Sequence, residues 1–392
     1  MSTLKKWVGN FGLMSVSIIL TLLFLEIILR FTSYVNLLPF SEFPEFYFEN
    51  DTVKCYDIRK NFSKSIAQVG RNRELLYEIW SNELGCFDTP YNGEGEYAIL
   101  LGDSFTHAYA PFNDKWGTRI ESFLDYRILK CGVTGYGTKQ ELFKAQEIIT
   151  QVNHPPKLII VGYFMNDLQD DNVFKMYLES PFKYRIKLFF RTNSILYNMS
   201  RITLKRVLTE IPDFENLIKK TVKKAPFRKN KNTDTAKLPS YAYAAELDNK
   251  PWIQQLWGWH LGNLKEFKVL ADSVGAKLLV IIIPVNMQVY SFFDRILASE
   301  NPNKILHEFF KREGIVYFDL LPKFRKFADL TPRKKLDSEK DLYFSVDGHW
   351  SIKGNHLAGL LVSKHILENN FLDIANKEGK LEDINEKLKG FH

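Results

Sequence analysis

Short apolar runs alternate with helical patterns from Tyr97 onward. This alternation predicts a parallel sheet covered by helices on both faces, so the expected fold class is α/β. Each apolar run is followed by Gly, Pro, Asn or Asp, and the carboxyl ends of such strands are where α/β proteins build their sites. We expect the strands at residues 97–101 (YAILL), 126–130 (YRILK), 157–161 (KLIIV), 277–283 (KLLVIII) and 315–320 (IVYFDL).

A second kind of pattern lies near the N-terminus, where residues 11–29 form an apolar run in which Glu26 is the only ionisable side chain. At about 1.5 Å per helical residue this run nearly crosses a hydrocarbon core of roughly 30 Å. It predicts a transmembrane anchor at residues 11–30. Lys5 and Lys6 precede it and residues 32–47 carry no Lys or Arg, which favours a cytoplasmic N-terminus (residues 1–10) and a periplasmic or extracellular bulk.

Two alternatives accompany the anchor. A cleaved signal peptide has a shorter apolar stretch that ends in small residues, whereas this run continues into Leu-Arg-Phe-Thr. Glu26 and Arg30 share a helix face and are expected to pair near the outer boundary. The other possibility for Glu26 is contact with an integral-membrane partner.

The apolar content of 45% in 392 residues suits one large catalytic domain with insertions. We divide it into residues 96–171 and 251–370, preceded by an extracytoplasmic segment at 31–95 and followed by a charged tail at 371–392, helical over 377–389. A basic helical insert occupies 172–250: between residues 182 and 238 there are 15 Lys or Arg and 4 Asp or Glu, a local charge of +11 in a chain of net +7.

The insert reads either as a solvated face with a flexible Lys-rich loop at 223–237, or as a surface for anionic lipid or an acidic polymer. The excess charge is confined to this segment and no recognition motif accompanies it. Nucleic acid is therefore not an expected partner.

The chain has three cysteines, and an oxidising compartment suits them if two pair. Cys55 with Cys86 is the expected pair because both precede the catalytic core, and Cys131 is expected to be a buried thiol. No Cys and His spacing resembles a metal site, so no metal or cofactor is implied.

The strand at 97–101 runs into Gly102-Asp103-Ser104, after which a helix is expected. A serine there lies at a helix N-terminus, where free N–H groups favour a developing oxyanion. The structural alternative is a plain turn in which Asp103 or Ser104 caps the helix. His107 is a rival base by proximity, but its ring would have to fold over the turn, so we assign it to pocket lining.

Asp347-Gly348-His349-Trp350 precedes an amphipathic segment at 351–366. A nucleophilic serine needs a base, and the base needs a carboxylate that fixes its tautomer, so Asp and His on one loop meet both needs. The alternative is that Asp347 caps the helix while His349 packs beside Trp350.

Two further segments offer oxyanion donors. Gly132-Val-Thr-Gly135-Tyr-Gly137 follows the second strand, and glycine lets a backbone N–H approach a substrate closely. Asn166-Asp167 follows the third strand, where Asn166 offers a side-chain amide; Asn-Asp is also ordinary turn chemistry.

Taken together in this order, the four segments resemble the SGNH hydrolases, or GDSL family, over roughly residues 96–171 and 277–367. The resemblance implies a flavodoxin-like three-layer α/β/α sandwich. It implies Ser104 as nucleophile, His349 as base oriented by Asp347, and an oxyanion hole from Ser104 N–H, Gly135 N–H and the Asn166 amide. Asp103, His107, Asp167 and Trp350 are expected to line the pocket.

The sequence departs from the family in two places. Asp-x-His replaces the usual Asp-x-x-His, a form that resembles membrane-linked relatives acting on cell-surface glycans. Phe-Met-Asn-Asp replaces the usual Gly-x-Asn-Asp.

These features predict a serine esterase or O-acyltransferase acting on acetyl or other acyl esters of an envelope or exported polysaccharide. A lipid acylhydrolase at the bilayer is the second hypothesis. The third is an inactive scaffold that binds glycan or recruits a membrane partner.

Overall fold

The computed structural model describes residues 2–31, 42–70, 73–179, 181–210, 251–290 and 299–391. Its centre is a five-stranded parallel sheet in the order β6-β5-β7-β8-β9. This order is the doubly wound, flavodoxin-like one, and it confirms the predicted α/β fold class. The strands are β5 (Ala98–Gly102), β6 (Ile128–Lys130), β7 (Leu158–Tyr163), β8 (Lys277–Ile282) and β9 (Val316–Asp319).

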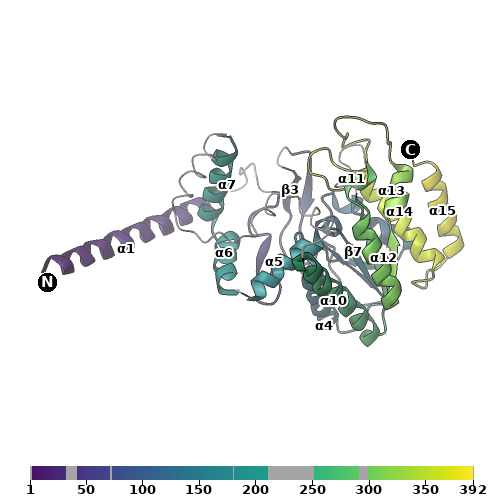
Figure 1. Cartoon of the computed structure of the whole chain (residues 1–392), viewed down its shortest axis with the longest axis horizontal. Helices are drawn as coiled ribbons and strands as arrows, with labels where there is room; N and C mark the ends of the chain where they lie inside the picture. Colours follow the sequence, from purple (N-terminus) through teal and green to yellow (C-terminus); the bar gives the residue numbers. More distant parts are fainter. Residues whose placement is uncertain are drawn as a thin grey trace.

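Helices cover both faces of this sheet. α3 (Trp116–Leu124) packs on α14 (Ile352–Glu368), and α4 (Thr138–Val152) packs on α10 (Pro251–Val274). In Figure 1, α4 and α10 lie on one side of β7 and α14 on the other. β5 and β7 are fully buried because helices enclose them, which is why their sequences are continuously apolar. The remaining elements of this body are α2 (Ser104–His107), η2 (Phe112–Asp114), α5 (Asp167–Glu179), α11 (Asn286–Val289), α12 (Asn301–Glu313), α13 (Leu321–Phe327) and α15 (Lys377–Lys389).

The segment before the sheet forms two antiparallel hairpins. β1 (Phe48–Asp51) pairs with β2 (Cys55–Ile58), and β3 (Ser65–Val69) pairs with β4 (Leu75–Ile79). Their inner faces share a hydrophobic cluster with residues from the loops after β5 and β6 and before α14, including Tyr109, Val133 and Phe344. The hairpins are therefore packed onto the edge of the sheet where the candidate site lies.

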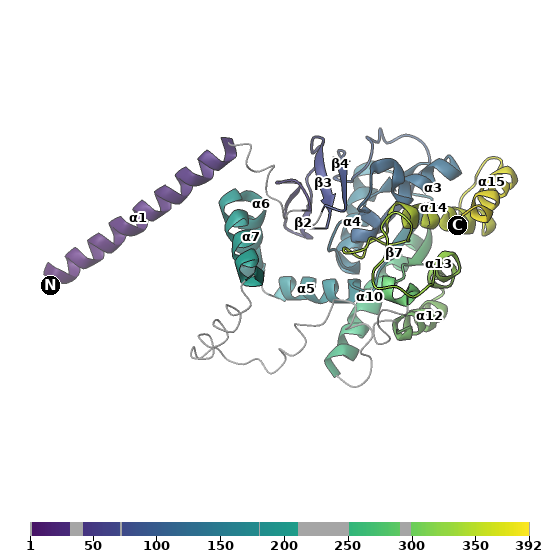
Figure 2. The same cartoon turned by 90° about the horizontal axis from the view of Figure 1, so that it is seen from above.

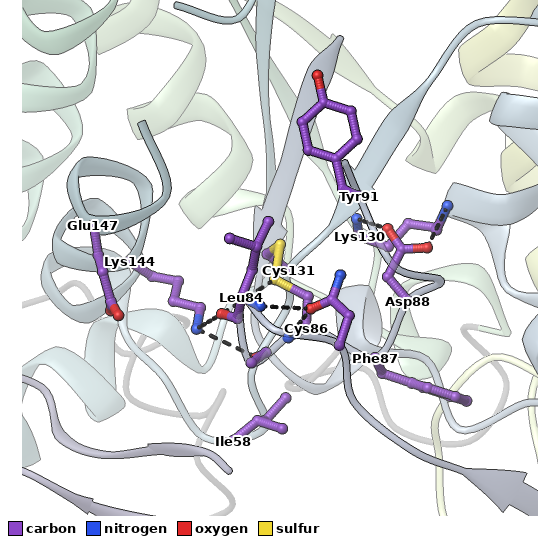
Figure 3. Close-up of a disulfide and its surroundings, with 12 residues drawn as sticks. Ile58, Leu84, Cys86, Phe87, Asp88, Tyr91, Lys130, Cys131, Lys144 and Glu147 are labelled. Carbon is purple, nitrogen blue, oxygen red and sulfur yellow. Dashed lines mark hydrogen bonds and ion pairs between the residues drawn. A yellow bond between two sulfur atoms is a disulfide. The ribbon is translucent and has the colours of Figure 1, made fainter. Parts of the chain in front are cut away.

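A disulfide joins Cys86 to Cys131 (Figure 3). Cys55 is a free thiol. The predicted Cys55–Cys86 pair is therefore wrong. Cys131 directly follows β6, and an ion pair and a hydrogen bond hold the 84–88 segment beside it. Lys130 Nζ lies 2.9 Å from Asp88 Oδ1, and Lys144 Nζ donates to the Leu84 carbonyl at 2.9 Å.

The N-terminal helix α1 (Ser2–Phe31) contains one span, Asn10–Phe31, that is long and apolar enough to cross a membrane. Glu26 accepts from Arg30 Nε at 3.1 Å, as predicted. The other contacts of Glu26 come from the same chain, because its carboxylate accepts from the backbone N–H groups of Ile195 and Leu196, both at 3.0 Å. These are free N–H groups at the start of α7 (Ile195–Glu210), which Glu26 caps from outside the helix.

α6 (Pro181–Asn193) and α7 are the described part of the predicted basic insert. They lie between α1 and the α/β body in both views (Figures 1 and 2). The predicted Lys-rich loop at 223–237 lies outside the described residues.

Candidate active site

Ser104 occupies the first position of α2, at the carboxyl end of β5, which lies between β6 and β7 in the sheet. Asp103 caps this helix by accepting from the Phe105 N–H at 2.9 Å. Gly102 makes the turn possible: its φ is +147°, and a Cβ there would lie 2.6 Å from the Gly162 carbonyl oxygen. The chain thus places the serine hydroxyl at the start of a short helix whose Phe105, Thr106 and His107 N–H groups are bonded to Asp103.

The loop before α14 brings His349 and Asp347 to this serine. His349 Nε2 lies 2.8 Å from Ser104 Oγ, and His349 Nδ1 contacts Asp347 Oδ1. With Nδ1–H donated to the carboxylate, Nε2 is left as an acceptor for the serine proton. A hydroxyl, an imidazole and a carboxylate that are far apart in sequence are therefore arranged in one line.

The electrostatics of this pair favour an ionised carboxylate beside a basic imidazole. Burial alone would lower the pKa of His349, but Asp347, Asp103 and Glu42 outweigh it, and the pKa is raised above its ordinary value. Burial acts the other way on Asp347, yet the pKa of this carboxyl is lowered because His349 lies against it. An imidazole of raised pKa takes a proton more readily, as a general base must.

Glu74, which sequence reasoning missed, holds the loop that carries the pair. It lies just before β4 in the second hairpin, and one carboxylate oxygen accepts from Ser338 Oγ at 2.8 Å and from the Ser345 N–H at 3.0 Å. The other oxygen accepts from the N–H groups of Val346 at 3.3 Å and Asp347 at 3.2 Å. Desolvation would raise the pKa of Glu74, but these bonds lower it. No local motif marks such a residue, since its partners lie more than 260 positions away.

The two predicted oxyanion segments follow the strands on either side of β5. The first is packed on α2, because a Cβ at Gly132 would lie 2.4 Å from the His107 backbone nitrogen. Within it Gly135 has a φ of +75°, and a Cβ there would lie 2.8 Å from Tyr56 Oη. Both the backbone conformation and the close contact therefore favour glycine at this position. The structure therefore leaves the Gly135 backbone in a conformation that other residues rarely adopt.

Asn166 lies between β7 and α5. Its Nδ2 donates to Asp170 Oδ2 at 3.0 Å, and its side chain also interacts with Asp103 in the nucleophile turn. Asn166 is thus positioned at the same edge as Ser104, while its role as an oxyanion donor stays a prediction.

Buried carboxyl groups lie beneath this edge. Burial, and then the neighbouring carboxyls, raise the pKa values of Glu141 and Asp167 far above their ordinary range. Burial also raises the pKa of Asp103 against the opposing effects of the Phe105 N–H and His349. In all three, burial disfavours the charged form of the carboxyl.

The four residues expected to line the pocket are all buried, and that role for them stays a prediction. Asp103, His107, Asp167 and Trp350 are each only 0–1% exposed. His107 bonds the Tyr47 hydroxyl at 2.9 Å, inside the aromatic cluster of the hairpins. Asp167 accepts from the Phe164 N–H at 3.1 Å. Rings that do flank the imidazole are Phe105 and Tyr109, with centroids 4.8 and 4.2 Å from that of His349.

One carboxylate cluster has the geometry of a metal site, formed by Asp51, Asp57 and Glu147. Lysines of the chain already neutralise it: Lys54 Nζ lies 2.8 Å from Asp51, and Lys144 Nζ lies 2.8 Å from Asp57. The cluster is therefore an ion-pair network between the first hairpin and α4.

No protein-family model matches the chain, and no curated protein does. Solved structures that resemble it include a GDSL-family lipolytic protein from Desulfitobacterium hafniense, at 13% identity and a TM-score of 0.34, with 69% of this chain and 99% of that one covered. A second GDSL-family protein, from Veillonella parvula, has 11% identity and a TM-score of 0.36, with 68% and 94% covered. An acetyl xylan esterase has 10% identity and a TM-score of 0.36, with 70% and 98% covered. Likeness at this level establishes neither family nor activity, and function is inferred from the site itself.

Proposed function

We propose that the chain is a serine esterase of the SGNH type, with Ser104 as nucleophile, His349 as general base and Asp347 as the orienting carboxylate. The observation that carries this proposal is the 2.8 Å approach of His349 Nε2 to Ser104 Oγ, with Asp347 on the opposite ring nitrogen. The Ser104 backbone N–H, at the first position of α2, is the donor proposed beside Oγ for an oxyanion.

In the proposed reaction His349 takes the Ser104 proton as Oγ bonds to the ester carbonyl carbon. The tetrahedral oxyanion is held by the N–H groups of Ser104 and Gly135 and by the Asn166 amide. His349 then gives its proton to the leaving alkoxide, and an acyl-enzyme remains. Water resolves this intermediate in an esterase, and a sugar hydroxyl resolves it in an O-acyltransferase.

We propose acetyl esters as substrates, carried on an envelope or exported polysaccharide. Ser104 is 6% exposed, and the rings of Phe105 and Tyr109 flank the adjoining imidazole. A buried nucleophile beside aromatic rings favours a small acyl group.

The proposed location is the outer face of a membrane. α1 supplies the anchor, and the lysines before it favour a cytoplasmic N-terminus. The Cys86–Cys131 disulfide supports an oxidising compartment for the catalytic body, since such bonds are rare in the cytosol.

A lipid acylhydrolase is the second candidate, and the exposed phenylalanines of α6 beside α1 favour it. Full-length protein in detergent should release acetate from an O-acetylated polysaccharide and leave phospholipid intact, and Ser104→Ala should lose that activity. Fatty-acid release without acetate release would favour the lipid hypothesis. If wild type and Ser104→Ala release equal amounts of acetate, the chain is not this enzyme.

A further inference from the structure

The helix α6 presents an apolar stripe to its surroundings. Phe182, Ile186, Phe189 and Phe190 are 78%, 44%, 54% and 45% exposed, and they follow the helical spacing i, i+4, i+7, i+8. Outside α1, the exposed phenylalanines among the described residues all lie on this helix. A globular protein in water does not gather its exposed large rings on one stripe without a surface to cover them.

Basic residues flank the stripe. The helix sequence PFKYRIKLFFRTN contains two lysines, two arginines and no acidic residue. Arg185, Lys187 and Arg191 are exposed. An apolar stripe bordered by cations is typical of a helix that lies in the interface of an anionic membrane.

The position of α6 relative to α1 indicates which surface covers the stripe. The joint between α6 and α7 is fastened to the last turns of the candidate membrane span. Glu26 caps α7 through Ile195 and Leu196, and Arg30 Nη2 donates to the Asn193 carbonyl at 2.5 Å. Both helices lie at the end of α1 where it meets the body (Figures 1 and 2). If α1 spans the bilayer, α6 is held at the level of the lipid headgroups.

We propose that α6 lies in the headgroup region of the leaflet where α1 ends, with its phenylalanines in the acyl boundary and its cations on anionic lipid. The two attachments, α1 and α6, then fix the orientation of the α/β body over the membrane and not only its distance. This inference rests on the anchor proposed above for α1, but not on the chemistry of Ser104.

The test uses full-length protein in lipid nanodiscs, with Cys55→Ser as background and the disulfide intact. An environment-sensitive fluorophore is attached to Phe189→Cys, to Leu20→Cys within α1, or to Val316→Cys on β9, which is 49% exposed. Spin-labelled lipid should quench the probes at positions 20 and 189 and leave the probe at 316 unaffected.

The dependence of quenching on lipid charge distinguishes a lipid interface from a protein surface that covers the stripe. Quenching at position 189 should fall when anionic lipid is replaced by phosphatidylcholine. It should also fall in Lys187→Gln/Arg191→Gln, in which each lost cation weakens attachment about five-fold. The matched control is Lys334→Gln/Lys335→Gln, another pair of exposed cations, and it should leave quenching unchanged.

Three results would overturn parts of this picture. Quenching at position 20 but not at 189 would refute the interfacial helix while leaving the anchor intact. A blue-shifted but unquenched probe at 189 would mean that protein, from this chain or a partner, covers the stripe. Absence of quenching at position 20 would remove the anchor and this inference with it, and esterase activity would remain to be judged separately.

Discussion

Glu74 offers a sharp test of how the site is assembled, because it is remote in sequence from every proposed catalytic residue. Its carboxylate accepts hydrogen bonds from Ser338, Ser345, Val346 and Asp347. In Glu74→Gln the side chain keeps its size. If the amide oxygen stays with the serines, however, the NH2 group faces the N–H groups of residues 346 and 347, donor against donor.

The magnitude follows from these bonds. A hydrogen bond to a charged group contributes about 1.5–3 kcal/mol. Glu74 is only half-buried, so water replaces part of the lost hydrogen bonding. We therefore take the free energy of one such hydrogen bond as the cost of the Glu74→Gln substitution. If that energy shifts the loop away from the aligned state, turnover falls roughly 10- to 100-fold.

The assay is the pH dependence of kcat and KM for a soluble acetyl ester. We expect kcat to fall with KM unchanged, because the loop positions the base and not the substrate. A looser Asp347–His349 contact stabilises the protonated imidazole less, so the pKa of His349 falls. The acid limb of the kcat–pH profile should therefore also move to lower pH. Glu78→Gln is the matched control, since Glu78 lies on the same hairpin and pairs with Lys64 at 3.2 Å in an exposed position. If Glu74→Gln and Glu78→Gln are both as active as wild type, the positioning role is refuted.

Three further changes test other parts of the site. Asp347→Asn should lower kcat about 10⁴-fold. Because burial then dominates, the pKa of His349 should fall, and the acid limb of the pH–rate profile should move to lower pH. An unmoved acid limb would argue against the Asp347–His349 pair. Asn166→Ala should lower kcat on the order of 10²-fold, with thermal unfolding as the check on folding; full activity would exclude it from the oxyanion hole. Cys86→Ser should lower the free energy of unfolding by about 2–5 kcal/mol in chemical denaturation, whereas Cys55→Ser should stay close to wild type, and equal losses would contradict the assigned disulfide.

The central sheet could be predicted from the sequence because β5, β6 and β7 are buried throughout and β8 is buried except at its first residue. Continuous apolar runs bounded by Gly, Pro, Asn or Asp are a strong local signal, and β5 and β8 lie within a residue of their predicted bounds. The triad residues could be proposed for a similar reason. Each follows a strand or precedes a helix, and parallel strands bring such ends to one edge.

The N-terminal hairpins could not be predicted, since strands of four or five residues with mixed patterns leave little periodicity to read. The disulfide was mispredicted for a related reason. Cys55 was paired with Cys86 because both precede the catalytic core, whereas the contacts of Asp88 with Lys130 bring Cys86 to the end of β6. Glu74 and the depth of His107 likewise depend on packing between distant segments, which no local pattern records.

The most direct test of the Ser104–His349 pair is reaction of full-length protein with a fluorophosphonate, followed by peptide mapping with mass spectrometry. We expect one phosphonyl adduct, on Ser104, formed at a rate that falls steeply in His349→Ala. An adduct on another residue, or equal labelling in wild type and His349→Ala, would contradict it.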